Sequence, residues 1–101
     1  MKVFISGSEK FDNIDEVEFW LTTNFSIPTD TLLISGNTNV DALLEKWAIE
    51  NDADYEIMLE DYDQAITAAN RVVCFYDGRD VSTVYIIGQV LKARKNLEVL
   101  F

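Results

Sequence analysis

The sequence predicts an α/β fold: a five-stranded parallel sheet with helices on both faces. Short apolar runs alternate with longer amphipathic stretches, which is the pattern of repeated strand–helix units. Asn, Asp or Thr, all good helix-capping residues, precede the amphipathic stretches. A length of 101 residues suits one domain, so we expect residues 1–101 to fold together. Right-handed crossovers favour the strand order 3-2-1-4-5, which reverses between the first and fourth strands.

Five apolar runs supply the strands, of which the third is the weakest. In chain order they are Lys2–Ser6, Thr31–Ser35, Asp54–Met58, Arg71–Tyr76 and Leu97–Phe101. Cys74 lies inside the fourth run, where we interpret it as a small core residue. A lone cysteine also rules out an intramolecular disulfide.

Four helices follow from apolar residues at a spacing of about 3.6. The first two bury Val17, Trp20 and Leu21, and Val40, Leu43, Leu44, Trp47 and Ala48. The third spans Asp61–Ala69, and the fourth runs from Asp80 to Lys95 with Val84, Ile87, Val90 and Leu91 on its apolar face. Candidate caps are Asn13, Thr38–Asn39, Glu60–Asp61 and Asp80. Most other large aromatic residues, including Tyr62 and Tyr85, are expected in or near the core.

The charge of the chain restricts its partners. The net charge is −10 and the isoelectric point about 4.1, so a nucleic-acid backbone would be repelled. Residues 1–70 carry −12 and residues 71–101 carry +2. This asymmetry fits either solvated helix faces or a polarised surface for a partner protein. We expect no nucleic-acid partner.

Two absences in the sequence limit chemistry and location. The chain has no histidine, the residue most often used for proton transfer or metal binding near neutral pH. It also has neither a signal-peptide pattern nor an 18-residue apolar stretch. We therefore expect a cytoplasmic protein with no membrane partner.

Three polar loops follow the first, second and fourth strands, and the predicted topology brings them together at the carboxyl edge of the sheet. Glycines there permit close backbone approach, hydroxyls and amides donate hydrogen bonds, and helix N-termini attract anions. Arg79 adds a planar cation, and Tyr76 could stack on a ligand ring. The alternative is that the glycines only turn the chain and the polar residues only cap helices. The candidate ligand-binding residues are Ser6, Gly7, Ser8, Ser35, Gly36, Asn37, Thr38, Asp41, Tyr76, Asp77, Gly78, Arg79, Ser82 and Thr83.

Common cofactor and metal motifs are missing. The first strand is followed by no GxGxxG, and no GxxxxGK[ST] occurs anywhere. The acidic run from Glu60 to Asp63 lacks the spaced ligands and the glycine of a calcium loop, so it indicates a helix N-terminus instead. We expect no metal and no cofactor.

Two stretches carry a resemblance to a known family. KVFISGSEKFDN and LLISGNTNVDALLEKWAIENDADYEIM resemble the YspA-type phage and bacterial proteins of the SLOG superfamily. Their first strand ends in T/S-G-S, and their second leads to a GGARGAD-type loop and a helix ending in Trp-Ala. The segment RVVCFYDGRDVSTVYIIGQVLKARKNLEVL resembles the F-W-D-G…S-x-G-T region of that family and the corresponding region of nucleoside 2-deoxyribosyltransferases. The resemblance implies a Rossmann-like fold that binds nucleotides or their derivatives.

The departures from these families concern catalysis. Where the transferases carry a catalytic glutamate, this chain has Ile86, and where the Lonely Guy phosphoribohydrolases carry one shortly after their G-T, it has Val84, Tyr85 and Ile86. An aliphatic side chain can neither attack an anomeric carbon nor stabilise an oxocarbenium-like centre. Asn37, Val40 and Ser82 also depart from the family pattern. Asp41 is retained, either to accept ribose hydroxyls or to serve the first turn of the second helix.

Three functional hypotheses follow. The first is a non-catalytic protein that binds a nucleotide or a derivative such as an ADP-ribose-like signal. The second is an acidic, phage-encoded protein that blocks a host enzyme through its −12 portion. The third is residual hydrolase or transferase activity on an N-glycoside, with Asp41 or Asp77 as the acid or nucleophile. We also expect a homodimer, because helices of related sheets often pair and Phe101 follows an apolar edge strand.

Overall fold

The computed structural model describes residues 1–36, 38–58 and 61–101, and its fold confirms the predicted α/β architecture. One five-stranded sheet, parallel throughout, has the order β3-β2-β1-β4-β5. Its strands are β1 (Lys2–Gly7), β2 (Thr31–Ile34), β3 (Asp54–Ile57), β4 (Arg71–Phe75) and β5 (Asn96–Leu100). The helices are α1 (Ile14–Asn24), α2 (Asn39–Glu50), α3 (Tyr62–Ala68) and α4 (Val81–Lys92).

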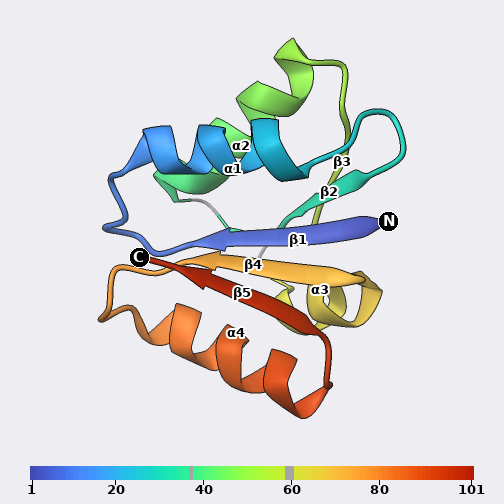
Figure 1. Cartoon of the computed structure of the whole chain (residues 1–101). Coiled ribbons are helices and arrows are strands. Elements are labelled where there is room, and N and C mark those ends of the chain that lie inside the picture. Colours follow the sequence, from blue (N-terminus) through green and yellow to red (C-terminus); the bar gives the residue numbers. More distant parts are fainter. Residues whose placement is uncertain (37, 59–60) are drawn as a thin grey trace.

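Two apolar layers hold the helices on the sheet. α1 and α2 cover one face, and α3 and α4 cover the other (Figure 1). Alternation along β1 serves both layers, since Val3 and Ile5 join the core beneath α1 and α2 while Phe4 joins the core beneath α3 and α4. Both faces of the central strands are therefore buried, as expected for a parallel sheet.

Capping residues fix three of the helix starts. Asn13 accepts a hydrogen bond from the Glu16 amide, and Asp61 from the Gln64 amide. Thr38 forms a capping box with Asp41 at the start of α2. The other candidate at the third helix, Glu60, lies outside the described residues.

The predicted apolar face of α4 is wrong in part. Val84 and Leu91 are exposed, whereas the buried residues are Thr83, Ile86 and Val90. Apolar residues surround almost the whole helix, so the 3.6-residue pattern cannot decide which face meets the sheet. The helix also ends at Lys92, before the predicted Lys95, because Arg94 adopts a left-handed conformation with φ of 56°.

The predictions for single core residues are confirmed for most positions. Cys74 and Trp20 are buried, and Trp47 and Tyr62 are partly buried against the two cores. Tyr85 is the exception, with 44% of its surface exposed. Its hydroxyl donates to Asp63 on α3 at 2.7 Å, so the side chain bridges the outer surfaces of two helices.

Candidate functional site

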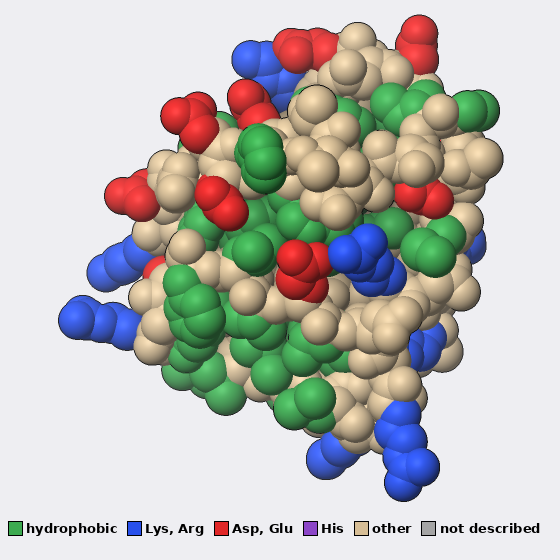
Figure 2. Space-filling view, in the orientation of Figure 1, with side chains coloured by type: hydrophobic (Ala, Val, Ile, Leu, Met, Phe, Trp, Pro, Cys, Tyr) green, Lys and Arg blue, Asp and Glu red, His purple; other side chains and the backbone are tan. Residues whose placement is uncertain are grey.

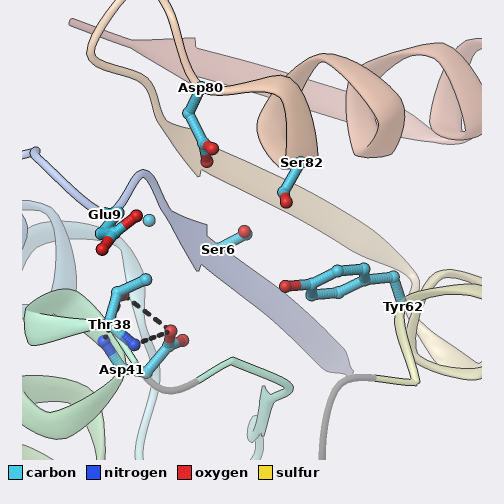
Figure 3. Close-up of a pocket in the computed structure, with 8 residues that line it drawn as sticks. Ser6, Glu9, Thr38, Asp41, Tyr62, Asp80 and Ser82 are labelled. Carbon is cyan, nitrogen blue, oxygen red and sulfur yellow. Dashed lines mark hydrogen bonds between the residues drawn. The ribbon is translucent and has the colours of Figure 1, made fainter.

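A cavity of about 420 Å³ lies at the carboxyl end of β1. β1 and the loop after it supply one wall, the N-terminus of α2 a second, the start of α3 a third and the N-terminus of α4 a fourth. Figure 3 shows side chains from these elements around one space; the lining residues are Ser6, Gly7, Glu9, Thr38, Asp41, Tyr62, Asp80 and Ser82. The loops after β1 and β4 and the N-terminus of α2 thus converge here, as the sheet order predicts.

Asp41 is the most unusual group in this cavity. The residue is only 5% exposed. Its Oδ2 accepts hydrogen bonds from the Thr38 amide at 3.0 Å and the Thr38 hydroxyl at 2.7 Å. Its Oδ1 has no hydrogen-bond partner among the residues that the structure describes. A buried carboxylate oxygen without a donor is costly, and this one belongs to a residue that lines the cavity.

Burial raises the pKa of Asp41 above its ordinary value. The hydrogen bonds from the Thr38 side chain, the Thr38 backbone and the Gly36 backbone act in the opposite direction. Both uses considered for Asp41 from the sequence are consistent with this position. It caps the first turn of α2 and it also lines the cavity.

Two glycines let α2 approach the sheet closely. A Cβ on Gly7 would collide with the side chain of Val40, and a Cβ on Gly36 would collide with the carboxylate of Asp41. Glycine is therefore required for packing at both positions. Near them, the buried hydroxyl of Ser35 also lacks a hydrogen-bond partner within the described ranges.

A chain of hydrogen bonds ties the loop after β1 to the start of α4. The Asp77 amide donates to Ser8 Oγ at 3.2 Å, Ser8 Oγ lies 2.8 Å from Thr83 Oγ1, and Thr83 Oγ1 donates to Asp80 Oδ2 at 2.8 Å. Because a carboxylate only accepts, the Thr83 proton goes to Asp80, and the Ser8 proton goes to Thr83. The two hydroxyls are therefore used internally and hold the two loops in register.

Because this hydrogen-bond network engages Asp80, the N-terminus of α4 has no side-chain cap. The carboxylate of Asp80 bonds the hydroxyl of Thr83, and it makes no capping bond to a backbone amide. Ser82, in the first turn, lines the cavity. The opening amides of α4 thus present partial positive charge next to it.

The cavity described above is the first of two hollows. A second hollow, of about 320 Å³, adjoins it and shares Glu9 and Asp80 with it. It is lined by Glu9, Lys10, Asp77, Arg79, Asp80 and Val81. The two hollows differ in charge. The lining of each hollow includes three carboxylates, but only the second also includes cations, Lys10 and Arg79, which offset two of them. An anionic group is better accommodated in the second hollow.

Asp77 shapes the turn that presents Arg79. Its Oδ1 accepts from the amides of Arg79 at 2.8 Å and Asp80 at 2.9 Å, and these bonds lower the pKa of Asp77. Gly78, between Asp77 and Arg79 in the sequence, has a φ of 88°, a conformation that favours glycine. Asp77 thus remains ionised and organises the loop.

The fourteen candidate residues fall into four groups. Five line the first hollow: Ser6, Gly7, Thr38, Asp41 and Ser82. Two line the second: Asp77 and Arg79. Six line neither: Ser8, Ser35, Gly36, Tyr76, Gly78 and Thr83. The last, Asn37, lies outside the described residues.

Tyr76 has a different neighbour from the one considered for it. Its ring lies 5.7 Å from the ring of Phe101, at the end of β5. Ile86, which occupies the position of the family glutamate in the resemblance, is 1% exposed and packs in the core beneath α3 and α4. Position 86 therefore points into the sheet layer, and its side chain is absent from the lining of the cavity.

Sequence reasoning missed five lining residues: Glu9, Lys10, Tyr62, Asp80 and Val81. Glu9 and Lys10 directly follow the Ser6–Ser8 loop, so extending that loop by two residues would have included them. Asp80 and Val81 belong to the polar loop that was expected at the site, but neither was among the candidate ligand-binding residues. Tyr62 was expected in the core, and no local pattern signals that it borders the cavity.

Comparisons with known proteins give no assignment, since no protein-family model, no curated protein and no solved structure matches this chain. Within residues 1–36, 38–58 and 61–101 no cluster of three or more metal-binding side chains occurs. No helix in these ranges is both long enough and apolar enough to cross a membrane.

Proposed function

We propose that this chain binds a nucleotide or a nucleotide derivative without transforming it, and that the ligand lies across the two adjoining hollows. The observation that carries the proposal is Asp41, a buried carboxylate beside the cavity with one oxygen that has no hydrogen-bond partner among the described residues. Such an oxygen is an acceptor for the hydroxyl groups of a ribose. The resemblance to SLOG proteins supports the same ligand class.

The charge distribution supports a particular orientation of the ligand. The three carboxylates of the first hollow disfavour phosphate, while its hydroxyls and carboxylates suit a polyhydroxylated, uncharged part of a nucleotide. The second hollow also has three carboxylates, but its two cations, Lys10 and Arg79, offset them in part and can bind the phosphate. A ribose in the first hollow and a phosphate in the second would use both.

The residue at position 86 is the reason to expect that the ligand is bound but not transformed. An isoleucine stands there, and its side chain is buried in the core, so α4 brings no carboxylate into the cavity from that position. Asp41 holds Thr38 with one oxygen and is fixed in a capping box. We assign it a binding role.

Isothermal titration and thermal shift test the proposal with adenosine, AMP, ADP-ribose, NAD, cyclic nucleotides, ribose and orthophosphate. We expect at least one nucleotide derivative to bind, and Asp41→Asn to weaken that binding about tenfold or more. Arg79→Ala should weaken the binding of phosphorylated ligands and leave the binding of nucleosides unchanged. Lys46→Ala is the matched control, because Lys46 is an exposed cation on α2 away from both hollows.

Two outcomes would overturn the proposal. A flat response to every compound in the set would remove its basis. Release of free base from a nucleoside 5′-monophosphate at high protein concentration would show that the chain is an N-glycoside hydrolase, with Asp41 or Asp77 as the first residues to substitute.

A further inference from the structure

α4 has a second apolar face, directed away from the sheet. Val81 is 79% exposed, Val84 53% and Leu91 62%, and Tyr85 is also exposed. With Gly88 these residues repeat at intervals of three and four, so they share one side of the helix. This outer stripe lies opposite the buried residues Thr83, Ile86 and Val90. Figure 2 shows hydrophobic side chains gathering in the lower part of the view, where β5 and α4 lie.

The charge of the molecule restricts what can cover this outer stripe. α4 contains no Asp or Glu, whereas residues 1–70 carry a net charge of −12. Two copies of a chain of net charge −10 repel each other across most of their surfaces. α4 itself brings no carboxylate to such a contact, and the neighbouring carboxylate of Asp63 accepts a hydrogen bond from Tyr85.

The ends of α4 are complementary to each other. Asp77 and Asp80 precede the helix with Arg79 between them, for a net charge of −1, and Lys92, Arg94 and Lys95 lie at or beyond its last turn, for a net charge of +3. In an antiparallel pair of α4 helices, the acidic end of each copy meets the basic end of the other. The helix dipoles are then also antiparallel, which is favourable.

Gly88 makes the outer stripe self-complementary in shape. A Cβ placed on Gly88 meets nothing within 4 Å, so no contact within the described part of the chain explains the glycine. In the antiparallel pair that sets Val81 opposite Lys92, Tyr85 of each copy faces Gly88 of the other. A large side chain over a residue without a side chain allows the two helices to approach closely.

We propose that a second copy of this chain covers the outer stripe, forming a two-fold homodimer by antiparallel packing of α4 on α4. The interface consists of Val81, Val84, Tyr85, Gly88 and Leu91 from both copies. It shares no residue with the first hollow and adjoins the second, whose lining includes Val81.

Sedimentation equilibrium of the wild type and three variants tests this proposal. We expect the wild type to dimerise with a Kd below about 0.1 mM, and Val84→Glu and Gly88→Gln to raise the Kd at least about tenfold. Ile49→Glu is the matched control: Ile49 is an apolar residue of α2 with a similar exposed fraction of 59%, and its substitution should leave the Kd within about twofold.

Gly88→Gln also separates loss of the interface from loss of the fold. At concentrations where the wild type is monomeric, this variant should melt about 4 °C higher, because glutamine is a better helix former than glycine and has room there. A wild type that stays monomeric to about 1 mM overturns the proposal, as does a dimer that survives Gly88→Gln or is lost equally in Ile49→Glu. If another protein covers the outer stripe, we expect the wild type to stay monomeric.

Discussion

At the scale of single residues, the informative groups are those whose surroundings differ from water. Cys74 and Asp41 are both buried, but one is apolar in character and the other is charged in its ordinary state. The desolvation that raises both pKa values therefore has different consequences. It makes Cys74 inert, and it makes the region around Asp41 sensitive to pH.

Burial raises the pKa of Cys74 to about 12, so the reactive thiolate is negligible at neutral pH. We expect no reaction of the native protein with a thiol-specific reagent, followed by labelling of the single cysteine once denaturant is added. Absorbance or mass spectrometry of the labelled chain measures this. Rapid labelling of the native protein would show that the core beneath α4 opens readily.

The raised pKa of Asp41 sets the direction of a pH effect on stability. Its pKa in the fold lies above the ordinary 3.8, so the folded chain takes up a proton before the unfolded chain does. The stabilisation by protonated Asp41 is present below the ordinary pKa and is lost as the pH rises through the folded pKa. The free energy of unfolding of the wild type should therefore rise relative to Asp41→Asn as the pH falls from about 7 to about 4.

Urea unfolding of both proteins across this pH range tests the expectation. The other carboxylates are common to the two proteins and cancel in the difference. A difference that does not change with pH would mean that Asp41 titrates as a solvated aspartate, and a difference of the opposite sign would mean that its hydrogen bonds outweigh its burial.

At the scale of secondary-structure elements, the close approach of α2 to β1 depends on Gly7. Gly7→Ala should destabilise the protein by about 1–3 kcal/mol, because the new methyl group would collide with Val40 and force a backbone shift. Gly88→Ala is the matched control, since the same change in α4 meets nothing and should stabilise the helix by about 1 kcal/mol. Thermal unfolding at a concentration where both are monomeric measures the two effects.

Opposite signs for the two glycines would support this account of α2 packing. A neutral Gly7→Ala would show that α2 can move away from β1 at little cost, and the shape of the first hollow would then be adjustable.

The elements were predictable because each strand and helix leaves a local signal. Buried parallel strands such as Arg71–Phe75 are short continuous apolar runs, and a capping residue such as Asn13 marks the start of its helix. The orientation of α4 was not predictable, because apolar residues lie on both of its sides and only the rest of the fold decides which side is buried. The bridge between Tyr85 and Asp63 follows from that choice.

The site was predictable at the level of loops but only in part at the level of residues. Strand order fixes which loops meet, so Ser6, Asp41 and Ser82 come together as expected. Sequence cannot show that Ser8 and Thr83 bond each other, since they are far apart along the chain. The same limit applies to Tyr62, which reaches the cavity only because α3 packs beside it.

At the scale of the whole molecule, the excess of negative charge acts against the fold. A net charge of −10 produces self-repulsion that salt reduces. In each ion pair between described residues, at least one partner has a side chain that is 32% exposed or more. Screening these pairs with salt therefore costs little stability. The melting temperature of the monomer should rise by roughly 5 °C between low salt and about 0.5 M NaCl.

Thermal unfolding followed by circular dichroism at both salt concentrations checks this. The control is the same pair of measurements near pH 4, where many carboxylates are neutral and the effect of salt should shrink. A melting temperature that falls with salt would show that favourable charge pairs outweigh the repulsion.

The position of β1 at the centre of the sheet also determines how the fold can be assembled during synthesis. Val3 of β1 pairs with Leu32 of β2 on one side and with Arg71 of β4 on the other. Every neighbouring pair of strands is parallel, so no hairpin can form early and seed the sheet. On a ribosome, β1 must wait with one side unpaired until β4 has emerged, and folding becomes a late event governed by closure of a long loop.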